Sequence, residues 1–421
     1  MKIGFIGLGK LGLPCALAIE KYGGHEVYGT DASLEVLANI AKRNVPYREE
    51  GLPELLLETR LRVCDIPELV ATCDILFVAV QTPHDPKFEG ITPLPEERAD
   101  FDYSYLVQAV KDVSREADRQ GRDLILAVIS TVLPGTVDRE VRPVLSSHIK
   151  LCYNPFFIAM GTTIRDFMNP EFVLLGVEDV EAADTVARFY ATLHSAEVVR
   201  MSIQSAELTK VAYNTFIGMK IVFANTLMEV CHHIPGSNVD DVTNALCKAP
   251  TRLISPKYLQ AGMGDGGGCH PRDNIAMSFL ARRLGLSYDL FESLMRARER
   301  QTEWLASLAM SESERTGLPI VILGKAFKPE TNLTVGSPAV LLESLLRSRG
   351  VDAAMYDPYI NPPEARPSGR AVYVVATKHA VFADWAFPEG SVVIDPWGLV
   401  AGQGVLSLGR RAVLADKPIH A

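Results

Sequence analysis

In the first half of the chain, short apolar runs alternate with amphipathic stretches of helical period. Residues 2–6 form the first apolar run, and the stretch after the next glycines is amphipathic to about Tyr22. Further runs cover 26–30, 74–80 and 124–129, and 74–80 is apolar at every position after Asp74, as in a parallel strand buried on both faces. Strands that alternate with helices in this way predict a doubly wound, Rossmann-like α/β sheet.

The turn after the first run has the spacing of a dinucleotide-binding fingerprint. Gly7, Gly9 and Gly12 form G-x-G-x-x-G between a strand and a helix, and the second strand ends at Asp31. Gly7 makes the tight turn, Gly9 lets a pyrophosphate approach, and Gly12 lets the helix pack on the strand. Asp31 would accept from a ribose 2′-hydroxyl and repel a 2′-phosphate, so we expect NAD rather than NADP.

Two later strands end in polar residues. The run 74–80 leads into Gln81-Thr82-Pro83, and 124–129 leads into Ser130-Thr131. Ligands of open α/β sheets bind beyond the carboxyl ends of strands, so Thr82 and Thr131 are predicted to face the cofactor. The alternative is helix capping or turn chemistry. The segment 84–102 is rich in proline and charge and is predicted to be a surface loop.

A long helix is predicted from about Ser202 to Glu229. Its apolar stretch contains Lys210 and Asn214, which are four residues apart and therefore on one face. If buried, these side chains need partners, as in a functional site; if exposed, they are a solvated stripe. An apolar helix of this length that joins two domains also predicts a contact between subunits.

The stretch Gly264-Asp265-Gly266-Gly267-Gly268-Cys269-His270-Pro271 places a thiol behind three glycines. Pro271 suits the first turn of a helix, so Cys269 is predicted to lie at a helix N-terminus, where the dipole favours a thiolate. The glycines would let a ligand approach the backbone. Such a thiol suits covalent catalysis, and the alternative is a buried structural cysteine on a tight turn.

A second α/β unit begins near Leu318. Strands are predicted in 319–324, 372–376 and 392–395, with a helix through 340–348. Only Gly324 lies where a fingerprint would need three glycines, so this half is predicted to bind something other than a full dinucleotide. Lys328 follows the first of these strands and could contact phosphate or simply be solvated.

Composition narrows the class of protein. The chain has 421 residues, 48% hydrophobic and 22% charged, which fits a globular protein of two or three domains. The net charge of −9 argues against nucleic acid and anionic membranes as partners. Seven scattered cysteines indicate free thiols in a reducing compartment and no metal site. No signal peptide or transmembrane run is apparent, so a cytoplasmic location is expected.

Taken together, these segments resemble the UDP-glucose/GDP-mannose dehydrogenase family over nearly the whole chain. The motifs that carry the resemblance include the fingerprint, the Cys269 loop and 51–56, 80–83, 130–136, 206–214, 258–262, 324–331 and 356–358. The resemblance implies an NAD-dependent, two-step oxidation of the hydroxymethyl group of a sugar nucleotide to a carboxylate. Among sugar nucleotides, a UDP-sugar is the expected substrate.

The resemblance also implies roles for single residues. Cys269 would form a thiohemiacetal and then a thioester, Lys210 and Asn214 would stabilise developing oxygen charge, and Asp273 with Thr131 would hold a water. The implied cofactor contacts are Gly7, Gly9, Leu11, Gly12, Asp31, Thr82, Pro83, Thr131 and Arg272. The implied substrate contacts are Lys210, Asn214, Tyr258, Leu259, Gly262 and Lys328, with Arg252 reaching the site of a partner subunit.

The expected organisation is a homodimer of three-domain subunits. Residues 1–198 would form an NAD-binding Rossmann domain, and 199–300 a central helical dimerisation domain with the cysteine loop. Residues 301–421 would form a Rossmann-like domain for the sugar nucleotide.

The chain departs from the family pattern where a base is expected. The family has glutamates at two positions of its Asn-Pro-Glu-Phe-Leu region, and here these positions are Phe156 and Met160. Glu171 lies in a similar tetrapeptide but in the wrong register, and Val335 replaces a usual arginine. His270, with an ordinary pKa near 6.5, could replace the missing base, or it could cap the helix or face solvent.

Three functions therefore stay open. The first is full oxidation to a uronate with an altered base. The second is a dehydrogenase that stops at the aldehyde or uses an unusual sugar nucleotide. The third is a weakly active, regulatory sugar-nucleotide-binding protein, which has no need of Cys269, Lys210, Asn214 and Asp273 together.

Overall fold

The structure is a computed structural model that describes residues 1–253, 255, 257–264 and 267–410. The chain divides into two compact units. The first comprises Met1–Pro83 and Asp100–Ala212, and the second comprises His84–Ala99 and the chain from Tyr213 onward. The chain thus leaves the first unit after Pro83, returns at Asp100, and leaves again within the long helix α8 (Ile203–His233).

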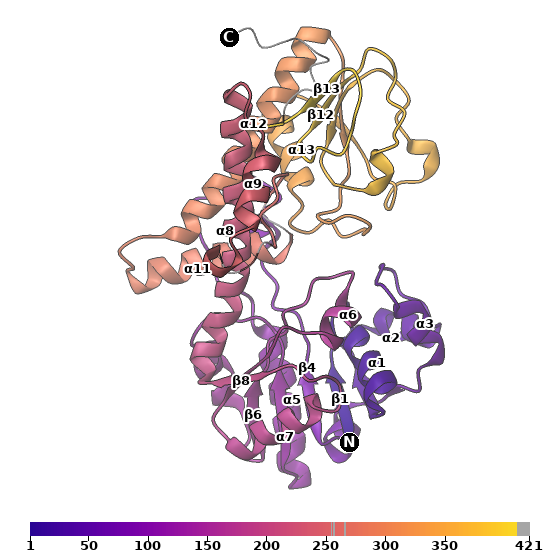
Figure 1. Cartoon of the computed structure of the whole chain (residues 1–421). Coiled ribbons are helices and arrows are strands. Elements are labelled where there is room, and N and C mark those ends of the chain that lie inside the picture. The colour runs from indigo at the N-terminus through magenta and orange to yellow at the C-terminus, as the bar shows by residue number, and fades with distance from the viewer. Residues whose placement is uncertain (254, 256, 265–266, 411–421) are drawn as a thin grey trace. The chain divides into compact units, whose positions relative to one another are not determined.

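The first unit is built on an eight-stranded sheet, which Figure 1 shows with its helices. The strand order is β3-β2-β1-β4-β5-β6-β7-β8, and neighbouring strands are parallel except β6 and β7. The strands are β1 (Lys2–Ile6), β2 (Glu26–Thr30), β3 (Arg62–Val63), β4 (Ile75–Val78), β5 (Leu124–Val128), β6 (Ile149–Tyr153), β7 (Val173–Val177) and β8 (Val198–Met201). The order of the first six is that of dinucleotide-binding folds, which confirms the predicted fold class.

Both faces of this sheet are covered by helices, so its central strands are apolar on both sides. Phe5 of β1 and Phe77 of β4 lie in a core with residues of α1, α3, α6 and α7, and their ring centroids are 5.1 Å apart. Gly4 faces the other side, where a Cβ atom would collide with Leu76 and Cys73. The helices of this unit before α8 are α1 (Gly12–Gly23), α2 (Leu34–Ala41), α3 (Leu52–Glu58), α4 (Ile66–Thr72), α5 (Ser104–Gln120), α6 (Thr163–Met168) and α7 (Val180–Tyr190).

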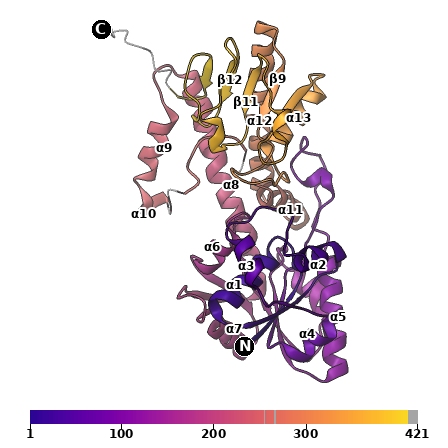
Figure 2. The same ribbon diagram turned by 90° about the vertical axis from the view of Figure 1, so that its right-hand side faces the viewer.

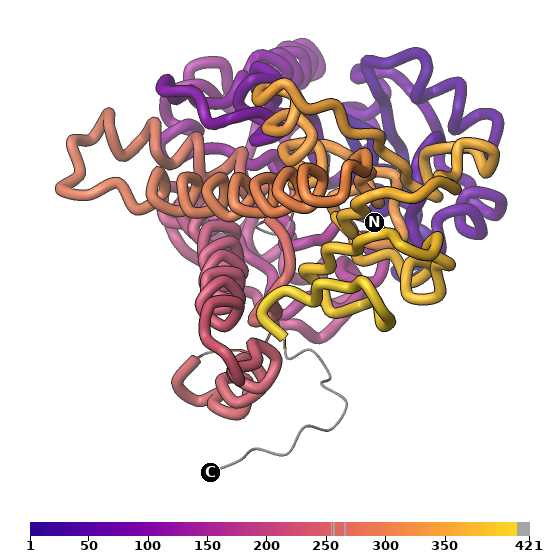
Figure 3. The backbone as a smooth tube through the Cα atoms, turned by 90° about the horizontal axis from the view of Figure 1, so that it is seen from above, coloured from indigo at the N-terminus to yellow at the C-terminus, as the bar shows by residue number. Residues whose placement is uncertain are grey.

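The second unit begins with helices. After α8 come α9 (Val239–Cys247), α10 (Pro250–Leu253), α11 (Cys269–Leu284) and α12 (Leu290–Thr316). Helices α11 and α12 pack against each other as a helical hairpin, whose backbone can be followed in Figure 3. Gly285 ends α11 in the left-handed conformation and the Asp289 side chain caps α12, so the turn between them is set locally.

A five-stranded, all-parallel sheet completes the second unit (Figure 2). Its order is β10-β9-β11-β12-β13, formed by β9 (Ile320–Leu323), β10 (Ala353–Tyr356), β11 (Val372–Val375), β12 (Val392–Asp395) and β13 (Val405–Ser407). Alternate strand residues, such as Ile322 and Val374, pack against α12 and α13 (Pro338–Ser348). The others, such as Leu323 and Val375, pack on the opposite face with Phe382.

The segment predicted as a surface loop is only partly one. Phe88 is 5% exposed and lies in an apolar cluster with Ile275 of α11 and Met295 of α12. Arg98 Nε donates to Ser278 Oγ at 3.2 Å. The many prolines and charged residues of 84–99 predicted an exposed loop, whereas its few apolar side chains pack on the helical hairpin of α11 and α12.

No helix in the described part of the chain is long and apolar enough to cross a membrane. Those same residues contain no group of three or more His, Cys, Asp or Glu side chains arranged to hold a metal ion.

Candidate functional site

The turn between β1 and α1 has the geometry that a dinucleotide needs. Gly7 has φ of +98°, and a Cβ there would lie 2.7 Å from Ala79 O. A Cβ on Gly12 would overlap the Gly7 carbonyl, whereas a Cβ on Gly9 would meet nothing within 4 Å. Gly7 and Gly12 are thus required by the fold, and Gly9 leaves an open approach to the backbone. Leu11 is the N-cap residue of α1 in the same turn.

Asp31 lies at the end of β2, beside this turn. One carboxylate oxygen accepts the Leu8 N–H at 2.7 Å, and the other accepts the Ser33 N–H at 2.8 Å. The side chain is fixed and only partly buried, so its remaining lone pairs can accept from a ribose hydroxyl. Together with the open space at Gly9, this arrangement fits NAD.

The polar residues after β4 and β5 join those two loops. Thr82 Oγ1 donates to Thr131 O at 2.9 Å, and Ser130 Oγ donates to Val80 O at 2.6 Å. Thr82 is buried, whereas Pro83 and Thr131 are partly exposed. Thr82 therefore stabilises the turn through its hydroxyl group. A contact between Thr82 and the cofactor stays a prediction.

Glu207 on α8 is a site residue that the sequence analysis passed over. It is fully buried and accepts N–H groups of Gly135 at 2.6 Å and Val137 at 2.8 Å. Burial raises the pKa of this carboxyl, although the two N–H groups oppose the rise. Glu207 therefore fixes the far end of the loop that carries Thr131. The sequence signal that could have identified Glu207 is an acidic residue in an apolar helix, three residues before Lys210.

Lys210 is buried in the first unit, which excludes a solvated stripe. Its Nζ donates to Phe156 O at 2.7 Å and lies 5.0 Å from the centroid of the Phe157 ring. Only 8% of the residue is exposed. The ammonium is thus held between a carbonyl and an aromatic face.

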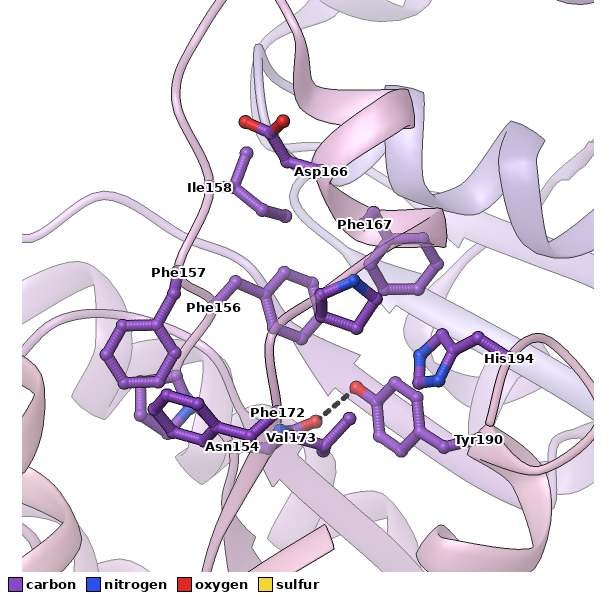
Figure 4. A pocket seen from close by; sticks show the side chains of 12 residues that line it. Asn154, Phe156, Phe157, Ile158, Asp166, Phe167, Phe172, Val173, Tyr190 and His194 are labelled. Carbon is purple, nitrogen blue, oxygen red and sulfur yellow. Dashed lines mark hydrogen bonds between the residues drawn. The ribbon is translucent and has the colours of Figure 1, made fainter. Parts of the chain in front are cut away.

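The Phe156 side chain lies in the hydrophobic core of the first unit. Figure 4 shows it among the side chains that line a small hollow, and its ring centroid is 5.3 Å from that of Phe167. Asp166, a carboxylate near this segment, accepts from Ala159 N and Thr162 Oγ1 at 3.0 Å each. Residues 154–160 therefore offer Lys210 a backbone carbonyl rather than a carboxylate.

Cys269 is the first residue of α11 in the second unit, and it is exposed. This confirms the predicted place at a helix N-terminus and excludes a buried structural cysteine. The partly exposed His270 follows it, with its N–H donating to Gly267 O at 3.2 Å.

The glycines before Cys269 make room for protein rather than for a ligand. A Cβ on Gly267 would lie 2.8 Å from the Phe327 ring, and one on Gly268 would lie 2.7 Å from Val335 O. The prediction that these glycines admit a ligand is corrected for both positions, because residues after β9 already occupy the space.

A buried polar group lies one turn into α11. Asp273 is fully buried, accepts from Asn214 Nδ2 at 2.7 Å and from Arg272 Nε at 3.2 Å. Asn214 is 7% exposed, so it too belongs to the interior. His84 lies in the field of this group: burial and then Arg272 lower its pKa to about 4. The imidazole of His84 is therefore neutral at pH 7.

Of the residues predicted to hold the sugar nucleotide, Arg252 lies in α10, and Tyr258, Leu259 and Gly262 lie between α10 and α11. Arg252 and Tyr258 are exposed, and Tyr258 has φ of +67°, whereas Leu259 is buried. The Gly262 N–H donates to Asn225 Oδ1 at 2.9 Å, and a Cβ on Gly262 would overlap the Trp397 ring. Asn225, which also donates to Gly264 O at 2.8 Å, is a second residue that the sequence analysis missed.

The predicted site residues thus fall into two groups. The first unit holds the cofactor residues of the fingerprint, Thr82, Pro83, Thr131 and Lys210. The second unit holds Asn214, Cys269, His270, Arg272 and Asp273, the segment with Arg252, Tyr258, Leu259 and Gly262, and the partly buried Lys328 after β9.

Two family models match most of the chain. Residues 1–194 match the NAD binding domain of the UDP-glucose/GDP-mannose dehydrogenase family, and residues 204–300 match the central domain of that family. The chain belongs to this family. It is therefore an oxidoreductase of the NAD-dependent nucleotide-sugar dehydrogenases.

Individual relatives differ in their sugar nucleotide. The UDP-glucose 6-dehydrogenase TuaD of Bacillus subtilis is 28% identical over 94% of this chain and 84% of its own length. The GDP-mannose 6-dehydrogenase of Pseudomonas aeruginosa is 27% identical over 97% and 91%. The two identities are nearly equal, so overall similarity does not select a nucleotide.

Two solved structures are similar to this chain over nearly its whole length. The UDP-glucose dehydrogenase of Pyrobaculum islandicum has a TM-score of 0.82 and 27% identity, covering 96% of both chains. The UDP-D-ManNAc dehydrogenase of Pyrococcus horikoshii has a TM-score of 0.81 and 25% identity, covering 97% of this chain and 99% of the other.

Proposed function

We propose that this protein oxidises the C6 hydroxymethyl group of a UDP-sugar such as UDP-glucose to a carboxylate through a covalent adduct on Cys269. The observation that carries the proposal is the exposed thiol on the first residue of α11, one turn before the buried Asp273–Asn214 pair. A thiol at a helix N-terminus is stabilised as a thiolate, the form that attacks a carbonyl carbon. NAD, when bound at the fingerprint, supplies the hydride acceptor.

The covalent sequence is as follows. After the alcohol has lost a hydride and a proton, the sulfur of Cys269 adds to the aldehyde carbon, and the carbonyl oxygen takes up a proton. Loss of a second hydride and that proton leaves a thioester. Water then attacks the thioester carbon, the C–S bond breaks, and the thiolate and a carboxylate are released. The balance is two NAD reduced and one water consumed for each substrate.

Lys210 and Asn214 are proposed to stabilise negative charge on the substrate oxygen. Lys210 is a buried ammonium held by the Phe156 carbonyl and the Phe157 ring, and a positive charge at this position would stabilise a developing oxyanion. Asn214 is oriented by Asp273, and Asp273 is oriented in turn by Arg272. Asp273, with Thr131, is proposed to hold the water.

One observation favours the shorter reaction as a second candidate. Residues 154–160 include no carboxylate, and Phe156 is committed to the core. General-base help is worth roughly 10²–10⁴-fold in rate, so hydrolysis of the thioester depends on another group. His270, beside the nucleophile, is proposed as that base. Without it, oxidation would stop before the carboxylate.

The deciding measurement is the amount of NADH formed per UDP-glucose consumed, with analysis of the product. Two NADH and a uronate support full oxidation, whereas one NADH and a trapped aldehyde contradict it. No turnover with UDP-, GDP- or TDP-sugars would favour the regulatory binding protein. Cys269→Ser should abolish uronate formation and leave NAD binding intact, with Cys247→Ser as the matched control. His270→Ala should let the thioester accumulate if His270 is the base.

We also propose a homodimer formed through α8. Phe216, Phe223 and Val230 are 39%, 50% and 47% exposed and recur every seven residues, so they form an apolar stripe on one side of the helix. Sedimentation should give a dimer for the wild type and a monomer for Phe223→Glu. Arg252 is proposed to serve the site of the partner subunit, and the three-domain division and cytoplasmic location stay predictions.

A further inference from the structure

The loop after β9 is held in a conformation that its sequence does not favour. This loop, residues 324–336, contains Lys325 and Lys328. Glu330 within it has φ of +58°, in the left-handed region that non-glycine residues rarely adopt. Such a conformation persists only where the surroundings enforce it.

His379 supplies that enforcement. It is fully buried just before the short helix Ala380–Phe382, and its Nδ1 lies 3.0 Å from Glu330 N. A backbone N–H can only donate, so Nδ1 accepts and the ring hydrogen is on Nε2. Nε2 lies 3.1 Å from Asp357 Oδ2, and that carboxylate accepts this hydrogen. Both nitrogens of a neutral imidazole are therefore used. The Glu330 carboxylate accepts the Ala380 N–H at 3.1 Å, which closes the clamp.

Asp357 connects this clamp to the start of the loop. Its Oδ2 also accepts the N–H groups of Lys325 at 2.7 Å and Ala326 at 3.0 Å. Burial raises the pKa of Asp357, but the hydrogen bonds from His379 and the two N–H groups outweigh this and hold it below the usual value. Thr377 Oγ1 donates to Ala326 O at 2.6 Å on the same side. Both halves of the loop are thus fixed by buried polar groups.

The other side of this loop supports the turn before Cys269. The Phe327 ring and Val335 O fill the space that side chains at Gly267 and Gly268 would need. A Cβ on Gly336 would collide with Gly268, and Gly336 O accepts from Arg298 Nη2 at 3.2 Å. One loop therefore carries two lysines suited to phosphate and also forms the wall behind the thiol.

We propose that His379 is a positioning residue that, with Asp357, holds loop 324–336 in place both for the diphosphate of the sugar nucleotide and for the turn that presents Cys269. The nucleotide part of this inference rests on the proposed function. The part that concerns the thiol does not.

The first measurement uses no turnover. Wild type, His379→Ala, His379→Asn and His379→Gln are titrated with UDP and with GDP by calorimetry, and Cys269 alkylation by iodoacetamide is followed by peptide mass spectrometry. His379→Ala leaves the Glu330 N–H without its acceptor and removes one of the three hydrogen bonds to Asp357 Oδ2, so we expect Kd for the nucleotide to rise about ten-fold. We expect Cys269 alkylation to become several-fold faster, because the wall behind the turn loosens.

The conservative variants identify the atom that matters. Asn places an oxygen where Nδ1 lies and should keep nucleotide binding and alkylation near the wild-type values. Gln lacks an acceptor at that branch and should behave like Ala. Val393→Ala is the control for a general loss of stability, because Val393 lies in an apolar cluster of the same sheet whose members do not include residues of the loop. It should lower thermal stability and change neither readout.

The outcomes separate this inference from the proposed function. If His379→Ala changes both Kd and alkylation beyond Val393→Ala, the inference is supported. Unchanged values for both in a folded variant overturn it, and equal loss in Val393→Ala reduces His379 to a stabilising residue, which also overturns it. If wild type binds neither UDP nor GDP, the proposed function fails, and alkylation alone decides the role of His379.

Discussion

The two parallel sheets begin with the same backbone turn and use it differently. After β1, Gly7 has φ of +98°; after β9, Gly324 has φ of +100°. In both turns the glycine N–H donates to the last carbonyl of the neighbouring strand, at 2.9 and 2.7 Å. The next N–H donates at 2.7 Å to an aspartate just beyond that strand, Asp31 or Asp357.

The surroundings of the two aspartates differ. Asp31 is partly exposed, and the backbone at Gly9 nearby is open. Asp357 is fully buried, and besides the Lys325 N–H its carboxylate accepts from Ala326 N, Tyr359 N and His379. The same local turn is therefore a ligand cradle where the protein leaves it open, and an internal brace where the protein fills it.

The strongest way to break this comparison is to remove each carboxylate. Asp357→Ala leaves three backbone N–H groups and the His379 N–H without their acceptor, so it should lower the free energy of unfolding by about 3 kcal/mol. Asp31→Ala should cost less than about 1 kcal/mol, because water can replace the partly exposed carboxylate. Urea unfolding followed by circular dichroism measures both, and equal losses would contradict the contrast.

Glycine substitutions test the shared turn. Gly7→Ala and Gly324→Ala each place a side chain at positive φ against neighbouring atoms, so each should destabilise by about 2 kcal/mol. Gly9→Ala meets nothing within 4 Å and should leave unfolding unchanged while weakening NAD binding. Thermal unfolding with NAD titration checks this; a destabilised Gly9→Ala protein would show that its backbone is not open.

The dependence of stability on pH tests a second histidine of the second unit, the partly buried His84. Unfolded His84 takes up a proton near 6.5, whereas the folded group does so only at about 4. Stability should therefore fall as pH drops from 6.5 to 4, with His84 contributing at most roughly 2–3 kcal/mol to the loss. His84→Gln should flatten that part of the curve of unfolding free energy against pH. An unchanged slope would mean that folding does not lower the pKa of His84.

Cofactor choice gives the smallest expected effect. Asp31→Ala removes the charge that opposes a 2′-phosphate, so the NADP-to-NAD ratio of Kd values should improve about ten-fold toward NADP. Glu35→Ala, an exposed acid on α2, is the matched control and should leave the ratio unchanged. If Asp31→Ala also leaves it unchanged, Asp31 is only part of the turn, as Asp357 is.

Much of the fold could be predicted because its signals are local. The apolar run 74–80 identified β4, the spacing of Gly7, Gly9 and Gly12 identified the cofactor turn, and Pro271 marked the start of α11. Burial of Lys210 and Asn214 could only be posed as a choice, because helical spacing places residues on one face without saying what covers it. Phe88 was missed for the same reason: its partners on α11 and α12 lie far along the chain.

By itself, the sequence determined the alternation of strands and helices, the fingerprint, and the thiol at the start of a helix. Each depends on residues within one turn or one strand of each other, where backbone sterics and hydrogen bonding decide the outcome. Only the tertiary structure decided that Asp357 is closed off by His379, that Phe327 fills the space beside Gly267, and that Phe156 belongs to the core. Those pairings join segments far apart in the chain, and packing rather than local preference selects them.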